Sequence, residues 1–177
     1  MRVIAGRHRG ARLRAPRGEA TRPTSDRVRE ALFSILASVD GARVLDLFAG
    51  SGAMGIEALS RGAASAVFVD TASTAVAVIR HNLQALGLQA EVAQRPAVAF
   101  LAAAANRSAQ YDLVFLDPPY RLASVLGPEL SVATPPVLDG DARVVTESDR
   151  RAPLALDLPL IDERRYGDTL IRIYVAR

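Results

Sequence analysis

The chain reads VLDLFAGSGAMG over residues 44–55, an apolar run followed by a loop rich in glycine. The apolar run is typical of a buried β-strand. Gly50, Gly52 and Gly55 match the G-x-G-x-x-G pattern that joins such a strand to a helix in nucleotide-binding sheets. Asp70 follows at the separation expected for an acid that holds a ribose. The stretch therefore predicts an α/β fold with a ligand at the glycine loop.

Strands and helices alternate on both sides of this loop. Apolar and β-branched runs predict strands over 44–47, 66–70, 91–93, 113–116 and 142–146. Helical patterns are expected over 53–61 and 74–86, with an alanine-rich helix ending near Asn106. Two last segments, 158–165 and 169–175, resemble a hairpin around Gly167 that would add one antiparallel strand. The alternation predicts a mostly parallel sheet covered on both faces.

The amino-terminal part of the chain is strongly basic. Residues 1–29 hold nine arginines against two acids, whereas the remainder carries a net charge of −4. Because Pro16, Gly18 and Pro23 prevent a long helix, we expect residues 1–23 to form a small β-hairpin arm, followed by a main domain over 24–177. A basic arm on a mildly acidic body indicates a polyanionic partner. The candidate nucleic-acid contacts are Arg7, Arg9, Arg12, Arg22 and Arg27.

A helix is expected directly after the arm. Thr24, Ser25 and Asp26 are all suited to the N-cap position. Apolar residues then recur at helical spacing, at Val28, Leu32, Ile35 and Leu36. This pattern predicts about three turns, with Arg27 and Arg29 off the apolar stripe.

Composition excludes several classes of protein. The 177 residues suit one domain with a short appendage, and half of them are hydrophobic. The absence of cysteine excludes disulfides, cysteine-based zinc sites and a cysteine nucleophile. The two histidines, His8 and His81, are too few for a multi-histidine metal site, so we expect no metal. No apolar run has the length of a signal peptide or a membrane span, which predicts a cytoplasmic protein without membrane contact. We expect a monomer.

Asp46 distinguishes between the two cofactors that such a loop binds. A carboxylate beside the loop would repel the pyrophosphate of a dinucleotide at the helix N-terminus. The same carboxylate would help to hold the ammonium group of a methionine moiety. Asp70 ends the second strand and offers two oxygens to ribose hydroxyls. These features favour S-adenosylmethionine, and the candidate cofactor-binding residues are Asp46, Phe48, Gly50, Ser51, Gly52 and Asp70.

The fourth strand ends in Asp117-Pro118-Pro119-Tyr120. Two prolines after an apolar strand cannot continue it and hold the chain rigid. The Asp117 carboxylate and the Pro118 carbonyl can then converge on one amino group. An exocyclic amine on a base is a poor nucleophile, and two acceptors on its protons free its lone pair to attack an electrophilic methyl group. Tyr120 offers a face on which the base can stack, so Asp117, Pro118 and Tyr120 are the candidate catalytic residues.

Four segments of the chain form one recognisable set, TRPTSDRVREALF (21–33), VLDLFAGSG (44–52), EALSRGA (57–63) and FLDPPY (115–120). Together they resemble one bacterial family, the D-type small-subunit enzymes that methylate the N2 amine of a guanine in 16S rRNA. This resemblance implies a Rossmann-like class I methyltransferase fold, with a seven-stranded mostly parallel sheet and an N-terminal hairpin extension. The implied substrate is the guanine conventionally numbered 966, in the 30S subunit, with S-adenosylmethionine as methyl donor.

Two positions depart from the family pattern. Relatives often carry Glu where this chain has Asp70, whose shorter side chain still permits a ribose contact. Many class I enzymes have an acid near the adenine after the third strand, whereas this chain has Gln94-Arg95-Pro96-Ala97. Recognition of the adenine is therefore expected to rest on backbone groups.

Three other functions stay open on the residues alone. An NAD-binding oxidoreductase would share the glycine loop, but the segment 117–120 has no role in hydride chemistry. A DNA adenine-N6 methyltransferase shares 117–120 but usually carries a target-recognition domain, for which this chain has no room. An RNA-binding module with a degenerate enzyme fold would need neither the three strand-end acids nor the complete tetrapeptide. Cofactor titration and identification of the methylated base distinguish these functions.

Overall fold

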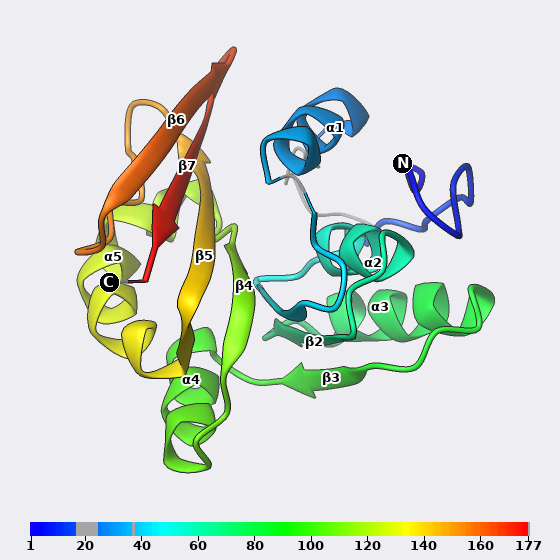
Figure 1. The fold of residues 1–177 in the computed structure, drawn as a ribbon, viewed down its shortest axis with the longest axis horizontal. Coiled ribbons are helices and arrows are strands. Elements are labelled where there is room, and N and C mark those ends of the chain that lie inside the picture. The colour runs from blue at the N-terminus through cyan, green and yellow to red at the C-terminus, as the bar shows by residue number, and fades with distance from the viewer. Residues whose placement is uncertain (17–24, 37, 177) are drawn as a thin grey trace.

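A seven-stranded sheet runs through the molecule, with helices on both of its faces (Figure 1). The computed structural model describes residues 1–16, 25–36 and 38–176. The strands are β1 (Arg43–Leu47), β2 (Ser65–Asp70), β3 (Glu91–Gln94), β4 (Tyr111–Leu116), β5 (Leu138–Asp149), β6 (Leu160–Tyr166) and β7 (Thr169–Val175). The helices are α1 (Asp26–Ile35), α2 (Ala53–Ser60), α3 (Ser73–Ala85), α4 (Ala97–Asn106), α5 (Tyr120–Ala133) and the short 3-10 helix η1 (Pro135–Val137).

The strands follow the order β3-β2-β1-β4-β5-β7-β6. All neighbours from β3 to β5 are parallel, whereas β7 is antiparallel to both β5 and β6. The predicted class I fold with one antiparallel strand is therefore confirmed. The chain winds outward from β1 to β3 and then returns to β4 on the other side of β1. The ends of β1 and β4 thus flank the switch point at which open parallel sheets bind ligands.

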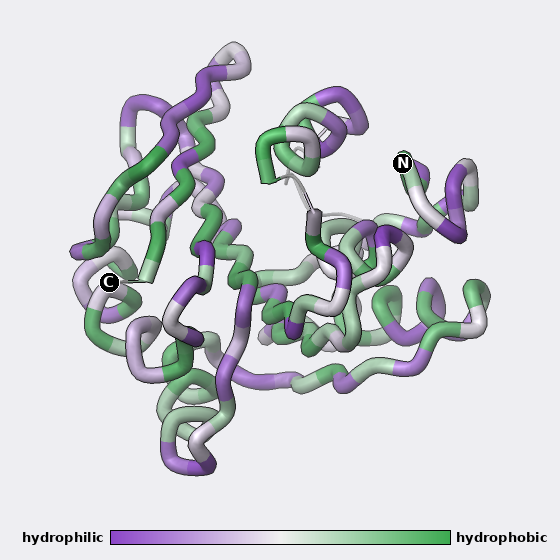
Figure 2. Tube along the Cα trace, viewed as in Figure 1, coloured by the Kyte–Doolittle hydropathy of each residue, from purple (hydrophilic) through white to green (hydrophobic). Residues whose placement is uncertain are grey.

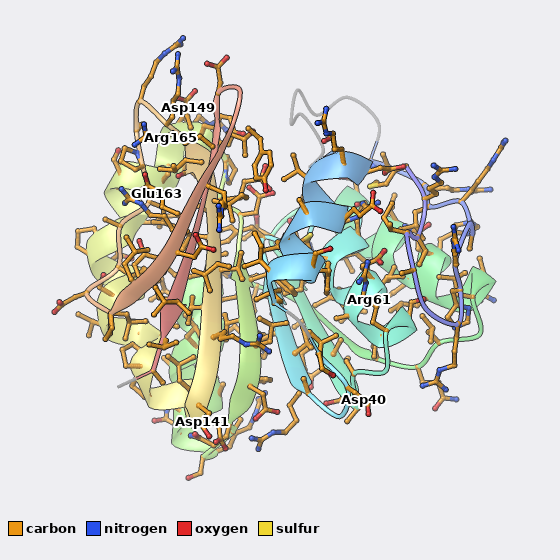
Figure 3. All side chains as sticks on the ribbon, turned by 45° about the horizontal axis from the view of Figure 1, so that its top comes forward. Asp40, Arg61, Asp141, Asp149, Glu163 and Arg165 are labelled. Carbon is orange, nitrogen blue, oxygen red and sulfur yellow. The ribbon has the colours of Figure 1, made fainter. Side chains whose placement is uncertain are left out.

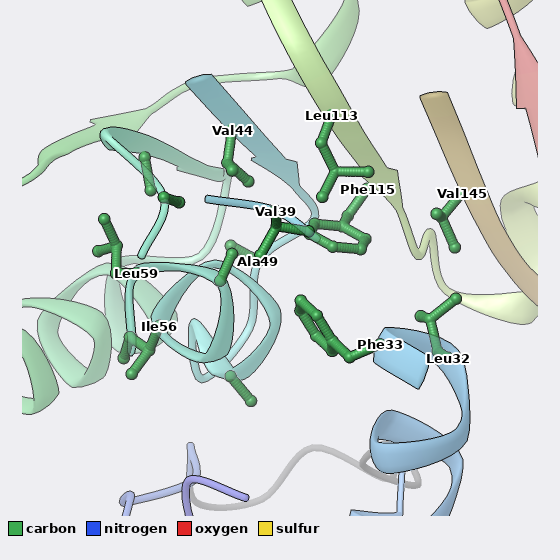
Figure 4. Close-up of a cluster of buried hydrophobic side chains, with 14 of the residues drawn as sticks. Leu32, Phe33, Val39, Val44, Ala49, Ile56, Leu59, Leu113, Phe115 and Val145 are labelled. Atoms are coloured by element: carbon green, nitrogen blue, oxygen red, sulfur yellow. The ribbon is translucent and has the colours of Figure 1, made fainter. Parts of the chain in front are cut away.

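Each face of the sheet has its own hydrophobic core, because successive side chains of a strand point to opposite faces. One core joins α1, α2 and α3 to strand residues such as Phe68 and Phe115. In Figure 4, Phe33 of α1 lies beside Phe115, with ring centroids 5.9 Å apart. The other core joins α4 and α5 to the alternate strand residues, such as Leu45 and Leu116. Burial on both faces explains why the strands are continuous apolar runs.

The N-terminal arm forms the hairpin expected from the sequence. A β-bridge joins Arg2 to Arg12 in antiparallel pairing. Val3 and Leu13 are buried in the core that contains α1, α2 and α3, so the arm shares the core of the main domain. Figure 2 shows that much of the arm near the N-terminus is nevertheless hydrophilic. The predicted domain boundary falls within 17–24, outside the described residues, and stays a prediction.

A buried carboxylate fastens the arm to α2. Glu57 is fully buried, and its two oxygens accept hydrogen bonds from the N–H groups of Ile4 at 2.7 Å and Ala5 at 3.0 Å. The next residue, Gly6, has a φ of 82° and lies against the Ser60 carbonyl, which a Cβ at that position would overlap. Only glycine permits this close approach. The first turn of the arm is therefore fixed to the helix by specific polar contacts.

Helix α1 begins as predicted, but the prediction for Arg29 was wrong. The N-cap is Ser25, whose side chain accepts a hydrogen bond from the Val28 N–H at 3.3 Å. Arg29 is fully buried, with its guanidinium donating to Asp26 at 2.9 Å and to the Arg2 carbonyl. Residues 29, 32, 33 and 36 also follow helical spacing, so Arg29 lies on the buried face. It connects α1 to the arm and presents no charge to solvent, in contrast to the exposed Arg27.

Helix α5 was not predicted from the sequence. Pro128 lies inside it, and Gly127 precedes that proline. Both residues are signals of helix termination, because proline lacks the N–H that a helix interior requires. The buried face of α5 nevertheless has helical spacing at Ala123, Gly127 and Leu130. This periodicity was the available signal, and packing onto the sheet outweighs the local preference against a helix.

We predict that Glu57→Ala lowers the free energy of unfolding by about 3 kcal/mol, since it leaves two partly buried N–H groups and Arg61 without their acceptor. The arm should also become sensitive to trypsin at its arginines. Urea unfolding and limited proteolysis measure the two effects. Glu129→Ala on the exposed side of α5 is the matched control. Equal stability and equal proteolysis of the two variants would show that Glu57 does not fasten the arm.

Candidate functional site

Three strand-end acids lie on one face of the sheet at one edge. Each of these acids, Asp46, Asp70 and Asp117, comes two residues after a strand residue that belongs to the core containing α1, α2 and α3. Side chains two residues apart on a strand point to the same face of the sheet, so all three acids point to the face that carries this core. All three lie at the carboxyl ends of parallel strands. In Figure 3, Asp149 lies at this end of the sheet, whereas Asp141 lies at the opposite end. The structure therefore brings together the three acids that the sequence singled out.

The glycine loop between β1 and α2 follows the predicted pattern. Phe48 has a φ of 60°, which is uncommon for a residue other than glycine and is often found at functional sites. Gly52 is the N-cap of α2, and its N–H donates to the Ala49 carbonyl at 2.7 Å. Gly55 lies so close to the Phe68 ring of β2 that a Cβ there would overlap it. The third glycine of the pattern thus serves close packing of the helix on the sheet.

Asp46 lies beneath this loop and is only 3% exposed. One of its carboxylate oxygens accepts a hydrogen bond from the Gly55 N–H at 2.9 Å. The pKa of Asp46 is raised to about 7, chiefly by burial; the Gly55 hydrogen bond acts in the opposite direction, and the nearby charge of Asp70 adds to the rise. Asp46 therefore changes its charge close to neutral pH. A cation bound beside it would favour the ionised form.

Asp70 uses one oxygen to bind the glycine loop and the other to bind the turn that follows β2. One accepts a hydrogen bond from the Gly50 N–H and the other from the Ala72 N–H, each at 2.9 Å. Each carboxylate oxygen can accept a second hydrogen bond, so these contacts leave capacity for ribose hydroxyls. The predicted ribose contact stays a prediction. Ser51, the remaining loop candidate, is anchored through its carbonyl, which accepts from the Asn82 side chain at 2.9 Å.

The segment 117–120 connects β4 to α5. Pro118 is buried and Asp117 is partly buried, so both lie inside the turn rather than on an exposed loop. Tyr120 is the first residue of α5. Its hydroxyl lies 3.3 Å from the hydroxyl of Thr169, at the start of β7. The ring of Tyr120 is thus held between α5 and β7, at the same edge as the strand-end acids.

The carboxylate of Asp117 lies in an electrostatically unfavourable place. Burial raises its pKa well above the usual value, and the charges of Glu147 and Asp46 raise it further. Burial also raises the pKa of the Tyr120 hydroxyl, with Glu147 and Asp117 among the contributing charges. These effects place Asp46, Asp117, Tyr120 and Glu147 in one electrostatic cluster.

Glu147 is a further acid at this site and is not among the residues predicted from the sequence. The sequence pattern predicts that the fifth strand ends at Thr146, whereas β5 continues to Asp149. Glu147 is 6% exposed and belongs to a strand buried along most of its carboxyl half. The available signal was an acid directly after the predicted strand, the same signal that identified Asp46, Asp70 and Asp117. The site therefore has four acids rather than three, and Glu147 lies two residues before the end of β5.

Four of the five arginines predicted to contact nucleic acid lie in the described part of the chain. The arginines of the arm, Arg7, Arg9 and Arg12, are all exposed, and so is Arg27 on α1. Arg22 lies outside the described residues. Within the part of the chain that the structure describes, none of the other four forms a salt bridge with an acid, so their charges are directed to solvent. A nucleic-acid role for these arginines stays a prediction.

Within residues 1–16, 25–36 and 38–176, no group of three histidine, cysteine or acidic side chains is arranged to hold a metal ion. In the same part of the chain, no helix has both the length and the apolar character needed to cross a membrane.

Known proteins resemble this chain over its whole length. A family model described as Conserved hypothetical protein 95 matches residues 1–175. YlbH of Bacillus subtilis is 40% identical over 183 residues, with 100% of both chains covered. Ribosomal RNA small subunit methyltransferase D of Haemophilus influenzae is 34% identical over 180 residues, covering 98% of this chain and 93% of that one. The solved structure of yhhF from Escherichia coli is 35% identical with a TM-score of 0.86, covering 100% and 98%.

The raised pKa of Asp46 predicts how Asp46→Asn changes stability. An acid whose pKa is raised to about 7 on folding favours the folded state when protonated, and this contribution is lost as pH rises from about 4 through 7. The amide introduced by the substitution would keep an acceptor for the Gly55 N–H without ionising. The variant should therefore match the wild type near pH 3, below the unfolded pKa, and exceed its unfolding free energy by up to about 4 kcal/mol at pH 8.

Urea unfolding of ligand-free protein across this pH range measures the difference. Asp141→Asn, at an exposed position at the opposite end of the sheet, is the control. A stability difference that does not change with pH would contradict the assigned environment of Asp46.

Proposed function

Because the chain belongs to the ribosomal RNA small subunit methyltransferase D family, we propose that it transfers a methyl group from S-adenosylmethionine to the N2 amine of a guanine in 16S rRNA. The observation that carries the proposal is the position of Asp117-Pro118-Pro119-Tyr120. This segment lies at the switch point of the sheet, across from the glycine loop and Asp46. By resemblance, the target is the guanine conventionally numbered 966, in the 30S subunit.

The residues at the loop fit this cofactor by their chemistry. Asp46 is buried beside other carboxylates, and an ammonium group placed next to it would relieve the cost that its raised pKa reflects. A dinucleotide pyrophosphate at the same loop would instead add negative charge. Asp46 would hold the methionine moiety and Asp70 the ribose, with Phe48, Gly50, Ser51 and Gly52 forming the wall. When bound, the cofactor supplies an electrophilic methyl group on its sulfonium.

The second half of the site prepares the amine for attack. In the proposed arrangement, the Pro118 carbonyl and the Asp117 carboxylate each accept one hydrogen of the exocyclic amine, which frees the nitrogen lone pair. Formation of the N–C bond, with the methyl–sulfur bond breaking and its electron pair going to sulfur, would make the amine more acidic, so that it loses one proton. The Asp117 carboxylate is placed to take that proton, and its raised pKa makes it a better base than an ordinary aspartate. Tyr120 would stack on the base.

The RNA substrate fits the charge distribution of the chain. The exposed arginines of the arm lie on a hairpin that packs against α2, whose N-terminal end faces the glycine loop. Phosphate contacts by the arm would thus be tied rigidly to the methyl-transfer site. A base inside a duplex cannot reach a pocket at the edge of a sheet, so the target must be unpaired or flipped out.

The proposal is tested with 30S particles from a strain that lacks the gene. Wild-type protein and S-adenosylmethionine should produce N2-methylguanosine in 16S rRNA, detected by mass spectrometry of nucleosides. Asp117→Ala should lose at least about 100-fold in turnover, because one acceptor at the reacting centre is removed, while calorimetry shows nearly unchanged affinity for S-adenosylhomocysteine. N6-methyladenine in DNA, or tight binding of NAD instead, would support one of the alternative functions.

The arm is predicted to contribute RNA affinity rather than chemistry. Replacing Arg7, Arg9 and Arg12 with Ala should weaken binding of 16S rRNA and reduce the slope of log affinity against log salt by about two to three units. Affinity for the cofactor should not change. The control carries three exposed arginines replaced elsewhere, at Arg80, Arg107 and Arg164. If both triple variants bind RNA alike at all salt concentrations, the arm has no special role.

A further inference from the structure

Glu147 lies directly beside Asp117 in the sheet. The register of the parallel strands β4 and β5 pairs Phe115 with Val145 and Leu116 with Thr146. The next position along both strands is therefore Asp117 on one and Glu147 on the other. Neighbouring strands are about 4.8 Å apart, and residues opposite each other in parallel strands point to the same face.

That face is the one on which the proposed reaction takes place. Ile171, which pairs with Glu147 across β5 and β7, belongs to the core that contains α1, α2 and α3. Thr169, two residues earlier on β7, points to the same face and contacts the Tyr120 hydroxyl. Glu147 thus lies between Asp117 and the Thr169–Tyr120 contact. It is 6% exposed, and its charge acts on both Asp117 and Tyr120, so its carboxylate lies near both residues.

The target base carries two neighbouring donors that match two neighbouring carboxylates. In guanine, the N1–H lies next to the N2 amine on the same edge of the ring. In adenine, the atom next to the N6 amine is an unprotonated N1, which is an acceptor. Two adjacent acids are costly to keep in a buried site, but guanine presents donors to both of them. Adenine would present a donor to one and a lone pair to the other.

We propose that Glu147 accepts the N1–H of the target guanine while Asp117 accepts from its N2 amine, and that Glu147 thereby selects guanine. The inference rests on the proposed guanine-N2 methylation and adds to it the residue that reads the base. Each carboxylate oxygen can accept two hydrogen bonds, so contacts of Glu147 within the protein leave capacity for this one. The arrangement rejects adenine because two acceptors would meet at Glu147 without a proton between them.

The test compares guanine with 2-aminopurine at the target position of 16S rRNA assembled into 30S particles. 2-Aminopurine keeps the amine on C2, but its N1 carries no hydrogen. Wild-type protein should methylate guanine at least about 100-fold more efficiently, because a site built for a donor rejects an analogue without it. Glu147→Gln offers both an acceptor and a donor, so its preference should fall below about tenfold. Asp117→Asn should slow both substrates and keep the preference.

The outcomes separate this inference from the proposed function. If the wild type produces N2-methylguanosine but methylates 2-aminopurine equally well, Glu147 does not read N1–H, and no variant is needed for that conclusion. A wild-type preference that Glu147→Gln retains in full would likewise overturn the inference. Failure of the wild type to produce N2-methylguanosine from the guanine substrate would instead overturn the proposed function. Calorimetry with S-adenosylhomocysteine confirms that each variant keeps its cofactor site.

Discussion

The hydrogen bond from the Gly55 N–H to the Asp46 carboxylate joins the start of α2 to the end of β1 where little water can reach. Because the bond lies in a place of low dielectric, it is strong, but the charge that accepts it is costly to keep there. The loop between the two joined elements is therefore held at both ends, and Asp70 fixes its middle through the Gly50 N–H. A loop fixed at these three points is organised before any ligand binds, so little ordering is required when one does.

Helix α2 transmits this order to the rest of the protein. Its N-terminal end borders the glycine loop, its inner side packs on β2 through Gly55, and Glu57 further along the helix binds the arm. Arg29 of α1 reaches the same arm through the Arg2 carbonyl. The segment proposed to contact RNA and the loop proposed to contact the cofactor are therefore attached to one short helix. Displacement of either segment would disturb the packing of the other, which explains why a basic arm is built into the core.

Sequence alone predicts the parts of this site that follow from periodicity. Apolar runs followed by an acid identified Asp46, Asp70 and Asp117, because strand ends in a parallel sheet share one edge. It did not predict the parts that depend on tertiary contacts. Helix α5 forms despite Pro128 because its buried face packs on the sheet, and Arg29 is buried because Asp26 and the arm provide acceptors. Glu147 follows an apolar run in the same way as the other acids, but the local pattern does not show that β5 pairs with β4 in the register that places Glu147 beside Asp117.

The acids of the site share a property that connects stability to the proposed chemistry. Asp46 and Asp117 have raised pKa values, and Glu147 adds to the negative charge around Asp117. Ionisation of the two aspartates therefore costs free energy in the ligand-free site. Each molecule in the proposed reaction brings what this site lacks: an ammonium group to Asp46, an amine to Asp117 and an N1–H to Glu147. Electrostatic cost in the free protein would thus become binding free energy in the complex. NAD would bring negative charge to the loop, and adenine would bring a lone pair to Glu147, so the arrangement that destabilises the free protein also selects its ligands.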